Sequence, residues 1–191
     1  MAEKRIVSTT EEQNGFAVRD LILIAVLLAA GAVLKLTVSS FLSFAGMKPN
    51  FMIAMYCLAI ILVRPKLFQA VLIGFITGLI SQIPMLNATP LVNLASETLG
   101  ALVCGILVLV LAKVARDNFA AQSVAFPAVI TFLSTLVSGY TFALIVGCGI
   151  NGLGVAQVLL MYVPMVFGTA GMNAVCVAIL TPVLKKALKR A

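Results

Sequence analysis

The sequence predicts an all-α integral membrane protein, a bundle of six transmembrane helices with both termini in the cytoplasm. Long apolar runs separated by short charged breaks carry this prediction, together with the side on which the charges fall. Of the 191 residues, 62% are hydrophobic, 10% are charged and none is histidine. Such a composition lies outside the range of soluble domains. A helix of about 20 apolar residues crosses a hydrocarbon core of about 30 Å.

The apolar runs cover residues 20–42, 50–63, 67–84, 94–112, 124–147 and 156–184. A membrane β-barrel would instead show short alternating segments, unlike the unbroken stretch from Leu21 to Leu34. In lipid every backbone group must be satisfied internally, so these runs are expected to be helices. We expect a cytoplasmic tail at 1–18, without a cleaved signal peptide, and one membrane domain at 19–191.

The placement of the positive charges predicts the orientation. If the six helices alternate in direction, eleven of the thirteen Lys and Arg fall on one side, with Lys35 and Lys48 as the exceptions. These eleven are Lys4, Arg5, Arg19, Arg64, Lys66, Lys113, Arg116, Lys185, Lys186, Lys189 and Arg190. The positive-inside rule places that side, and with it both termini, in the cytoplasm. The net charge of +7 is therefore assigned to orientation and membrane-lipid headgroups, and not to nucleic acid.

Glu97 is the most informative polar residue, because it lies in the first turn of the fourth span. A carboxylate inside a span is costly unless it is paired or hydrated, so it usually marks a pathway or a site. The alternative is that it complements the positive end of the helix. We favour a site because Asn93, Glu97, Gly100 and Cys104 share one helical face.

The second span is short. Its 14 residues (50–63) reach only about 21 Å as a helix. Its outer end is therefore expected below the membrane surface, with the loop 43–50, which carries Phe44 and Lys48, dipping inward. Tilt of the neighbouring helices is the competing explanation. Lys35, near the outer end of the first span, is interpreted as a side chain that snorkels to the headgroups.

The last two spans carry polar stripes, interpreted as helix-packing surfaces. They comprise Thr131, Ser134, Thr135, Ser138 and Phe142 on one span and Tyr162, Thr169 and Asn173 on the other. Tyr140, Phe142 and Tyr162 are expected level with Glu97, either to stack on an aromatic ligand or to form an interfacial belt. The glycines of 147–154 match G-x-G-x-x-G, but a membrane helix precedes them, so a tight outer loop is expected.

Several chemistries are not indicated. The four cysteines (Cys57, Cys104, Cys148 and Cys176) form no C-x-x-C and have no histidine to complete a metal site, so no cofactor is expected. No nucleophile–base pair or metal triad suggests an enzyme. No G-x-x-x-x-G-K-[ST] motif indicates an ATPase. In the first span, Ala25 and Ala29 form a small-residue surface that serves either internal packing or docking to a partner membrane subunit.

Six spans in about 190 residues with Ala25-x-x-x-Ala29 in the first resemble the substrate-binding (S) subunits of energy-coupling factor (ECF) transporters. The segments 46–51 (Gly-Met-Lys-Pro-Asn-Phe), Arg64-Pro65 and 71–80 resemble the tryptophan-transporter branch of that group. The chain departs from the branch pattern near Asn93, where Ser96-Glu97 stands in place of an Asp-Lys-like pair.

The resemblance implies a substrate-capture subunit of an ECF-type ABC transporter that imports a small nutrient, here tryptophan or a related aromatic zwitterion. Ala25 and Ala29 would dock to a membrane coupling subunit that works with two ATP-binding-cassette ATPases. Glu97 would bind the ammonium group, and Lys48 assisted by Asn93 the carboxylate. The side chains that would hold the ring are Phe44, Tyr140, Phe142 and Tyr162. An S subunit for another vitamin and a stand-alone secondary carrier are the alternatives.

Overall fold

The computed structural model describes residues 16–42, 49–83, 86, 89–114 and 125–188, and all regular structure within them is helical. The elements are α1 (Val18–Leu36), α2 (Val38–Phe41), α3 (Met52–Val63), α4 (Leu67–Ile80), α5 (Val92–Val114), α7 (Ala125–Leu144), the π-helix η1 (Ile145–Ile150), α8 (Val155–Met161) and α9 (Val163–Ala187). The prediction of an all-α protein is confirmed, and each of the six apolar runs overlaps at least one of these helices.

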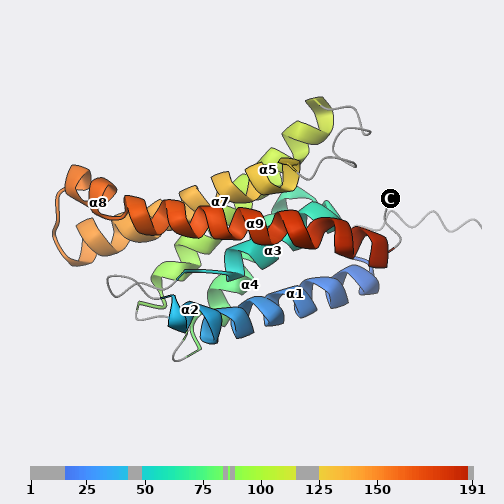
Figure 1. Cartoon of the computed structure of the whole chain (residues 1–191), viewed down its shortest axis with the longest axis horizontal. Coiled ribbons are helices and arrows are strands. Elements are labelled where there is room, and N and C mark those ends of the chain that lie inside the picture. The colour runs from blue at the N-terminus through green and yellow to red at the C-terminus, as the bar shows by residue number, and fades with distance from the viewer. Residues whose placement is uncertain (1–15, 43–48, 84–85, 87–88, 115–124, 189–191) are drawn as a thin grey trace, which may run out of the picture.

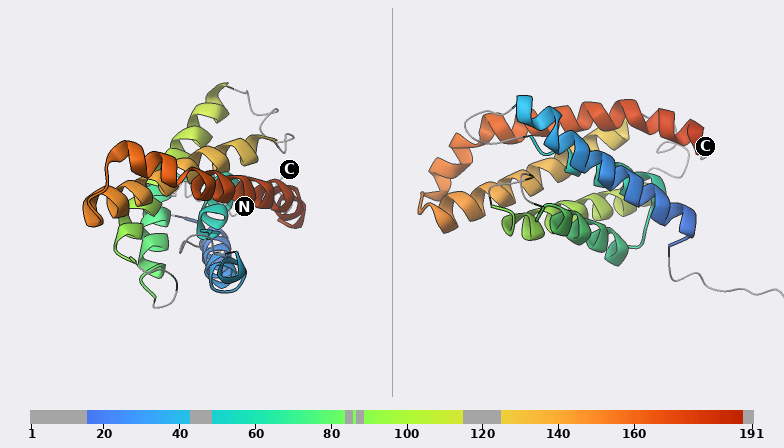
Figure 2. Two further views of the ribbon diagram at one scale, coloured as in Figure 1. Left: turned by 60° about the vertical axis from the view of Figure 1, so that its left-hand side comes forward. Right: turned by 90° about the horizontal axis from the view of Figure 1, so that it is seen from below.

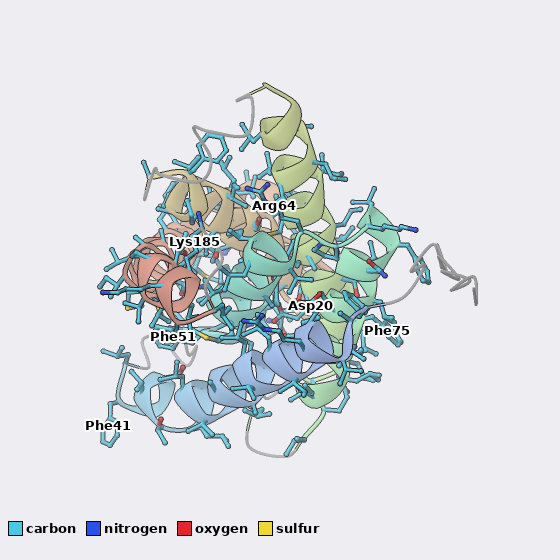
Figure 3. The ribbon with its side chains drawn as sticks, turned by 90° about the vertical axis from the view of Figure 1, so that its right-hand side faces the viewer. Asp20, Phe41, Phe51, Arg64, Phe75 and Lys185 are labelled. Carbon is cyan, nitrogen blue, oxygen red and sulfur yellow. The ribbon has the colours of Figure 1, made fainter. Side chains whose placement is uncertain are left out.

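The long helices run side by side between two ends of the bundle (Figure 1). The start of α1 and the end of α9 lie at one end, which we call the termini end. There the Arg19 guanidinium donates a hydrogen bond to the carbonyl oxygen of Leu188 at 2.7 Å. Asp20 lies in the first turn of α1, and Lys185, which is close to Arg64, lies in the last turn of α9, so all three belong to this end. Figure 3 views the bundle from this end. We call the opposite end, where α2, α8 and the start of α5 lie, the far end (Figure 1).

The outer surface is apolar. Val92–Leu111, Ala125–Ile150 and Val163–Ala187 are long and apolar enough to cross a membrane, and α3 and α4 are shorter apolar helices. Large hydrophobic side chains are exposed on the outer faces, among them Ile22, Val26, Val33, Val175, Ile179 and Val183. Polar side chains are buried between the helices instead. This distribution suits a lipid solvent and defines a multi-pass membrane protein.

Helix α3 is the core of the bundle. Its residues from Met52 to Ile60 are all at most 2% exposed. It packs against α1, α5, α7 and α9, which surround it in Figure 2. Its 12 residues span only about 18 Å. The helix ends at Arg64, whose left-handed conformation (φ 52°) stops it before Pro65. The short second helix expected from the sequence is therefore present and enclosed.

The expected loop at 147–154 is wrong in its first half. Residues Ile145–Ile150 continue α7 as a π-helix, and the backbone N–H of Asn151 bonds to Val146 O at 2.9 Å. Glycine alone does not end a helix where unpaired backbone groups cannot reach water. The turn is confined to residues 151–154, where Gly152 adopts a positive φ of 68°. Gly147 is required because a Cβ there would lie 2.5 Å from Val158 of the returning α8.

Helices α4 and α5 pack closely through two glycines that lie four residues apart on α4. A Cβ added at Gly74 would lie 2.7 Å from the carbonyl oxygen of Glu97. One added at Gly78 would lie 2.8 Å from the Cα of Leu94. This is the small-residue spacing that lets helix backbones approach in membranes. The contact fixes the first turns of α5, and hence Glu97, against α4.

Replacing Gly74 by alanine is expected to destabilise the protein, because the added methyl group meets backbone that cannot move aside. Overpacking of this kind costs about 1–3 kcal/mol. Thermal unfolding in detergent should show a lower Tm for Gly74→Ala than for the parent.

Gly171→Ala on α9 is the matched control, since nothing lies within 4 Å of its added Cβ. Both substitutions gain about 1 kcal/mol of helix propensity, so the difference between them isolates packing. Equal melting temperatures for the two variants would contradict the close approach of α4 and α5.

Candidate substrate-binding site

Glu97 lies in the first turns of α5, enclosed among the helices, and is 0% exposed. The side-chain amide of Asn50, just before α3, donates a hydrogen bond to its Oε1. The hydroxyl of Ser138 on α7 donates to its Oε2 at 3.4 Å. The carboxylate therefore draws donors from two other segments, which is what the burial of a charge requires.

Asn50 is itself held in place. Its Oδ1 accepts a hydrogen bond from the backbone N–H of Met52 at 3.3 Å, which fixes its side chain at the start of α3. Asn173 of α9 donates from Nδ2 to the backbone oxygen of Asn50 at 3.1 Å and to Thr135 Oγ1 at 3.3 Å. The start of α3, together with α5, α7 and α9, is thus joined in one hydrogen-bonded network.

Three further buried polar side chains lie near Glu97. Lys35 of α1 is 3% exposed and interacts electrostatically with Glu97. Asn93 lies one turn before Glu97 on α5 and is 1% exposed. Tyr56 of α3 is fully buried beside Gly100. We call the set the buried polar cluster; it consists of Lys35, Asn50, Tyr56, Asn93, Glu97, Ser138 and Asn173.

Several atoms of the buried polar cluster have no hydrogen-bond partner among the described residues. They are Lys35 Nζ, Tyr56 Oη, Asn93 Nδ2 and Asn173 Oδ1. Buried polar groups are almost always paired, and each unpaired one costs about 1–3 kcal/mol. Unpaired donors and acceptors gathered around a buried carboxylate indicate a place where a polar ligand supplies the missing partners. The cluster is therefore the candidate binding site.

The charged and polar residues singled out from the sequence differ in where the structure places them. Glu97 and Asn93 lie together in the buried polar cluster. Phe44 and Lys48 lie outside the described residues. The snorkelling expected of Lys35 is wrong, because its side chain is buried. It lies with Leu28 and Gly31 on the buried face of α1, the helix that packs on α3, so its ammonium faces the protein rather than the headgroups.

Of the predicted aromatic residues, Tyr140 and Phe142 lie on different faces of α7. Tyr140 lies two residues after Ser138, about 200° around the helix, so it points away from the face that carries Ser138. Its ring packs edge-on against Phe167, with centroids 6.4 Å apart. Phe142 is one turn beyond Ser138 on the same face and is half-buried. Tyr162 is half-buried at the junction of α8 and α9.

On α1, Ala25 and Ala29 are both exposed, so they lie outside the packed interior of the described residues. The cluster members that the sequence did not assign to a site are Lys35, Asn50, Tyr56, Ser138 and Asn173. Asn173 and Ser138 stood out only as packing residues, and Asn50 only as part of a loop. A polar side chain next to the short second span was the available signal for Asn50.

An apolar outer surface and several membrane helices define a multi-pass membrane protein, and its buried polar cluster with unpaired groups marks a candidate functional site. Residues 17–189 match the family model described as tryptophan transporter TrpP, so the chain belongs to this family. The probable tryptophan transport protein of Bacillus subtilis (strain 168) is 28% identical over 176 residues, which cover 90% of this chain and 94% of that protein. No solved structure matches the chain. The resemblance to the tryptophan-transporter branch is confirmed.

The hydrogen bond between Asn50 and Glu97 is expected to stabilise the fold. Asn50→Ala leaves a buried carboxylate with fewer donors and should lower the free energy of unfolding by about 1–3 kcal/mol. The loss should be smaller in a Glu97→Gln background, because a neutral amide requires less compensation. Unfolding of the four proteins of this cycle in detergent measures the coupling energy.

A second cycle that pairs Asn50→Ala with Thr181→Val is the control. The Thr181 hydroxyl bonds within its own helix, to Val177 O, so the two effects should be additive. Additivity of Asn50→Ala and Glu97→Gln as well would show that the two side chains do not interact.

Proposed function

We propose that the chain is the substrate-capture subunit of an ECF-type ABC transporter in the bacterial plasma membrane, and that it binds tryptophan or a related aromatic zwitterion from outside. The observation that carries the proposal is the fully buried Glu97 within a cluster of unpaired polar groups. Membership in the tryptophan transporter family supports the assignment of tryptophan as the ligand.

The distribution of charge supports capture from outside. Arg19 in the first turn of α1 and Lys185 and Lys186 in the last turn of α9 belong to the termini end. Arg64 lies near Lys185, and Lys66 follows it at the start of α4. The positive-inside rule favours the cytoplasm for this end. The start of α5, which carries Glu97, belongs to the far end (Figure 1). The ligand site therefore falls in the outer half of the bundle when the termini are cytoplasmic.

In this proposal Glu97 binds the ammonium group of the ligand. Its present donors, the Asn50 amide and the Ser138 hydroxyl, are both neutral. An ammonium group offers Glu97 a charge-assisted hydrogen bond, which is about twice as strong as one between neutral groups. Asn93 Nδ2, which is unpaired among the described residues, donates a hydrogen bond to the carboxylate of the ligand in this proposal. Phe142, on the same helical face as Ser138, is the aromatic residue best placed to contact the ring.

The proposed partners are a membrane coupling subunit and two ATP-binding-cassette ATPases. Ala25 and Ala29 present a small-residue surface on the exposed side of α1, where another helix can approach closely. Ligand capture and docking then use different surfaces of the bundle. Substitutions can therefore abolish ligand binding or docking separately.

Purified protein in detergent is expected to bind radiolabelled tryptophan, and Glu97→Gln is expected to weaken binding at least about 30-fold. Loss of one partner of a buried charged pair costs 2 kcal/mol or more, which corresponds to about that factor. Asp20→Asn makes the same chemical change at the termini end and should leave the affinity unchanged. Equal affinity of Glu97→Gln and the parent would remove the assignment of the ammonium site.

Ala25→Leu and Ala29→Leu are expected to abolish ATP-dependent uptake in proteoliposomes that also contain the coupling subunit and ATPases, while tryptophan binding stays intact. Bulk on this face prevents close helix approach. Gly168→Leu is the control, because Gly168 is exposed on α9 with nothing within 4 Å of its Cβ position. Tryptophan uptake by the isolated chain without ATP would favour the stand-alone carrier instead.

A further inference from the structure

We propose that Lys35 binds the carboxylate of the ligand, so that α1 forms one wall of the site and selects amino acids over the corresponding amines. The inference rests on the proposed function, because it assigns the second charge of the zwitterion that Glu97 captures. From the sequence, Lys48 in the loop 43–50 is expected to bind the carboxylate. The present inference assigns this role to Lys35, a residue of α1 whose position the structure describes.

The first argument is the burial of Lys35. It is the penultimate residue of α1, close enough to a helix end for its long side chain to reach the headgroups. Its side chain is nevertheless 3% exposed, and Nζ has no hydrogen-bond partner among the described residues. Burial of an ammonium group costs several kcal/mol unless other groups compensate it. A lysine that has an easy route to the surface but remains buried and unpaired points to a ligand.

The second argument is the relation between Lys35 and Glu97. Within the described part of the chain, these two are the buried charged residues. They attract each other electrostatically, yet Lys35 Nζ forms no hydrogen bond to the carboxylate. Neutral donors, from Asn50 and Ser138, contact the Glu97 oxygens instead. The cluster therefore holds one basic and one acidic side chain that do not hydrogen-bond to each other, in an interior shielded from water.

A zwitterion complements this arrangement. With its ammonium group on Glu97 and its carboxylate on Lys35, an amino acid replaces one separated pair of charges by two charge-assisted pairs. A ligand with only one of the two charged groups leaves the other buried charge uncompensated, which costs binding free energy. The two residues together thus discriminate against amines through Lys35 and against carboxylic acids through Glu97.

The test compares three probes that share an indole ring: tryptophan, tryptamine, which has no carboxylate, and indole-3-propionate, which has no amine. Their affinities are measured by competition with radiolabelled ligand or by calorimetry on the parent, Lys35→Met, Lys35→Arg and Glu97→Gln. Lys35→Met is expected to weaken tryptophan binding at least about 30-fold and to leave tryptamine unchanged or bound more tightly. Lys35→Arg, which keeps the charge, is expected to retain most of the preference for tryptophan.

Retained binding of tryptamine shows that a variant is folded, and Lys186→Met is the control for loss of an exposed lysine. The inference is overturned if Lys35→Met leaves the ratio of tryptophan to tryptamine affinity unchanged, whether or not both affinities fall. Lys35 would then act only through the stability of the fold. In that case the proposed function survives if Glu97→Gln still loses the preference for tryptophan over indole-3-propionate. Absence of tryptophan binding by the parent overturns both.

Discussion

The burial of the Glu97 carboxylate constrains the rest of the bundle. A charge removed from water must find donors, and here they come from segments far apart in the chain. Asn50 contacts it from the start of α3 and Ser138 from α7, while Asn173 of α9 holds Asn50 in position. The glycine contact of α4 fixes the helix that carries Glu97. The arrangement of these helices around α3 is therefore also the arrangement that compensates one buried charge.

The compensation is incomplete, and this links stability to ligand binding. Nζ of Lys35 and Nδ2 of Asn93 lack partners among the described residues, and each unpaired group lowers the stability of the ligand-free protein. A ligand that supplies the missing partners binds the folded state alone and so stabilises it. The polar groups that the proposed ligand would pair are therefore the same groups that lower the stability of the bundle.

Local patterns in the sequence predicted the helices and the Glu97–Asn93 face, because both follow from composition and from helical periodicity. The remaining cluster depends on contacts that no local pattern contains. Asn50 and Glu97 are 47 residues apart, and Asn173 lies 123 residues from Asn50. Whether Lys35 snorkels depends on which face of α1 packs on α3. The separation of Tyr140 from Ser138 could have been predicted from the sequence, since residues two apart on a helix do not share a face.

The enclosure of the short helix α3 also bears on biogenesis. A 12-residue helix is too short to partition stably into a bilayer of about 30 Å as an independent segment. The tight turn at Arg64 and Pro65 joins it directly to α4, so the two segments enter the membrane together as a hairpin. Helix α1 is available to pack on α3 from the start, whereas α5, α7 and α9 are synthesised later, so the enclosure of α3 is complete only when those helices arrive. The buried polar cluster, to which α7 contributes Ser138 and α9 contributes Asn173, is therefore complete only late in assembly.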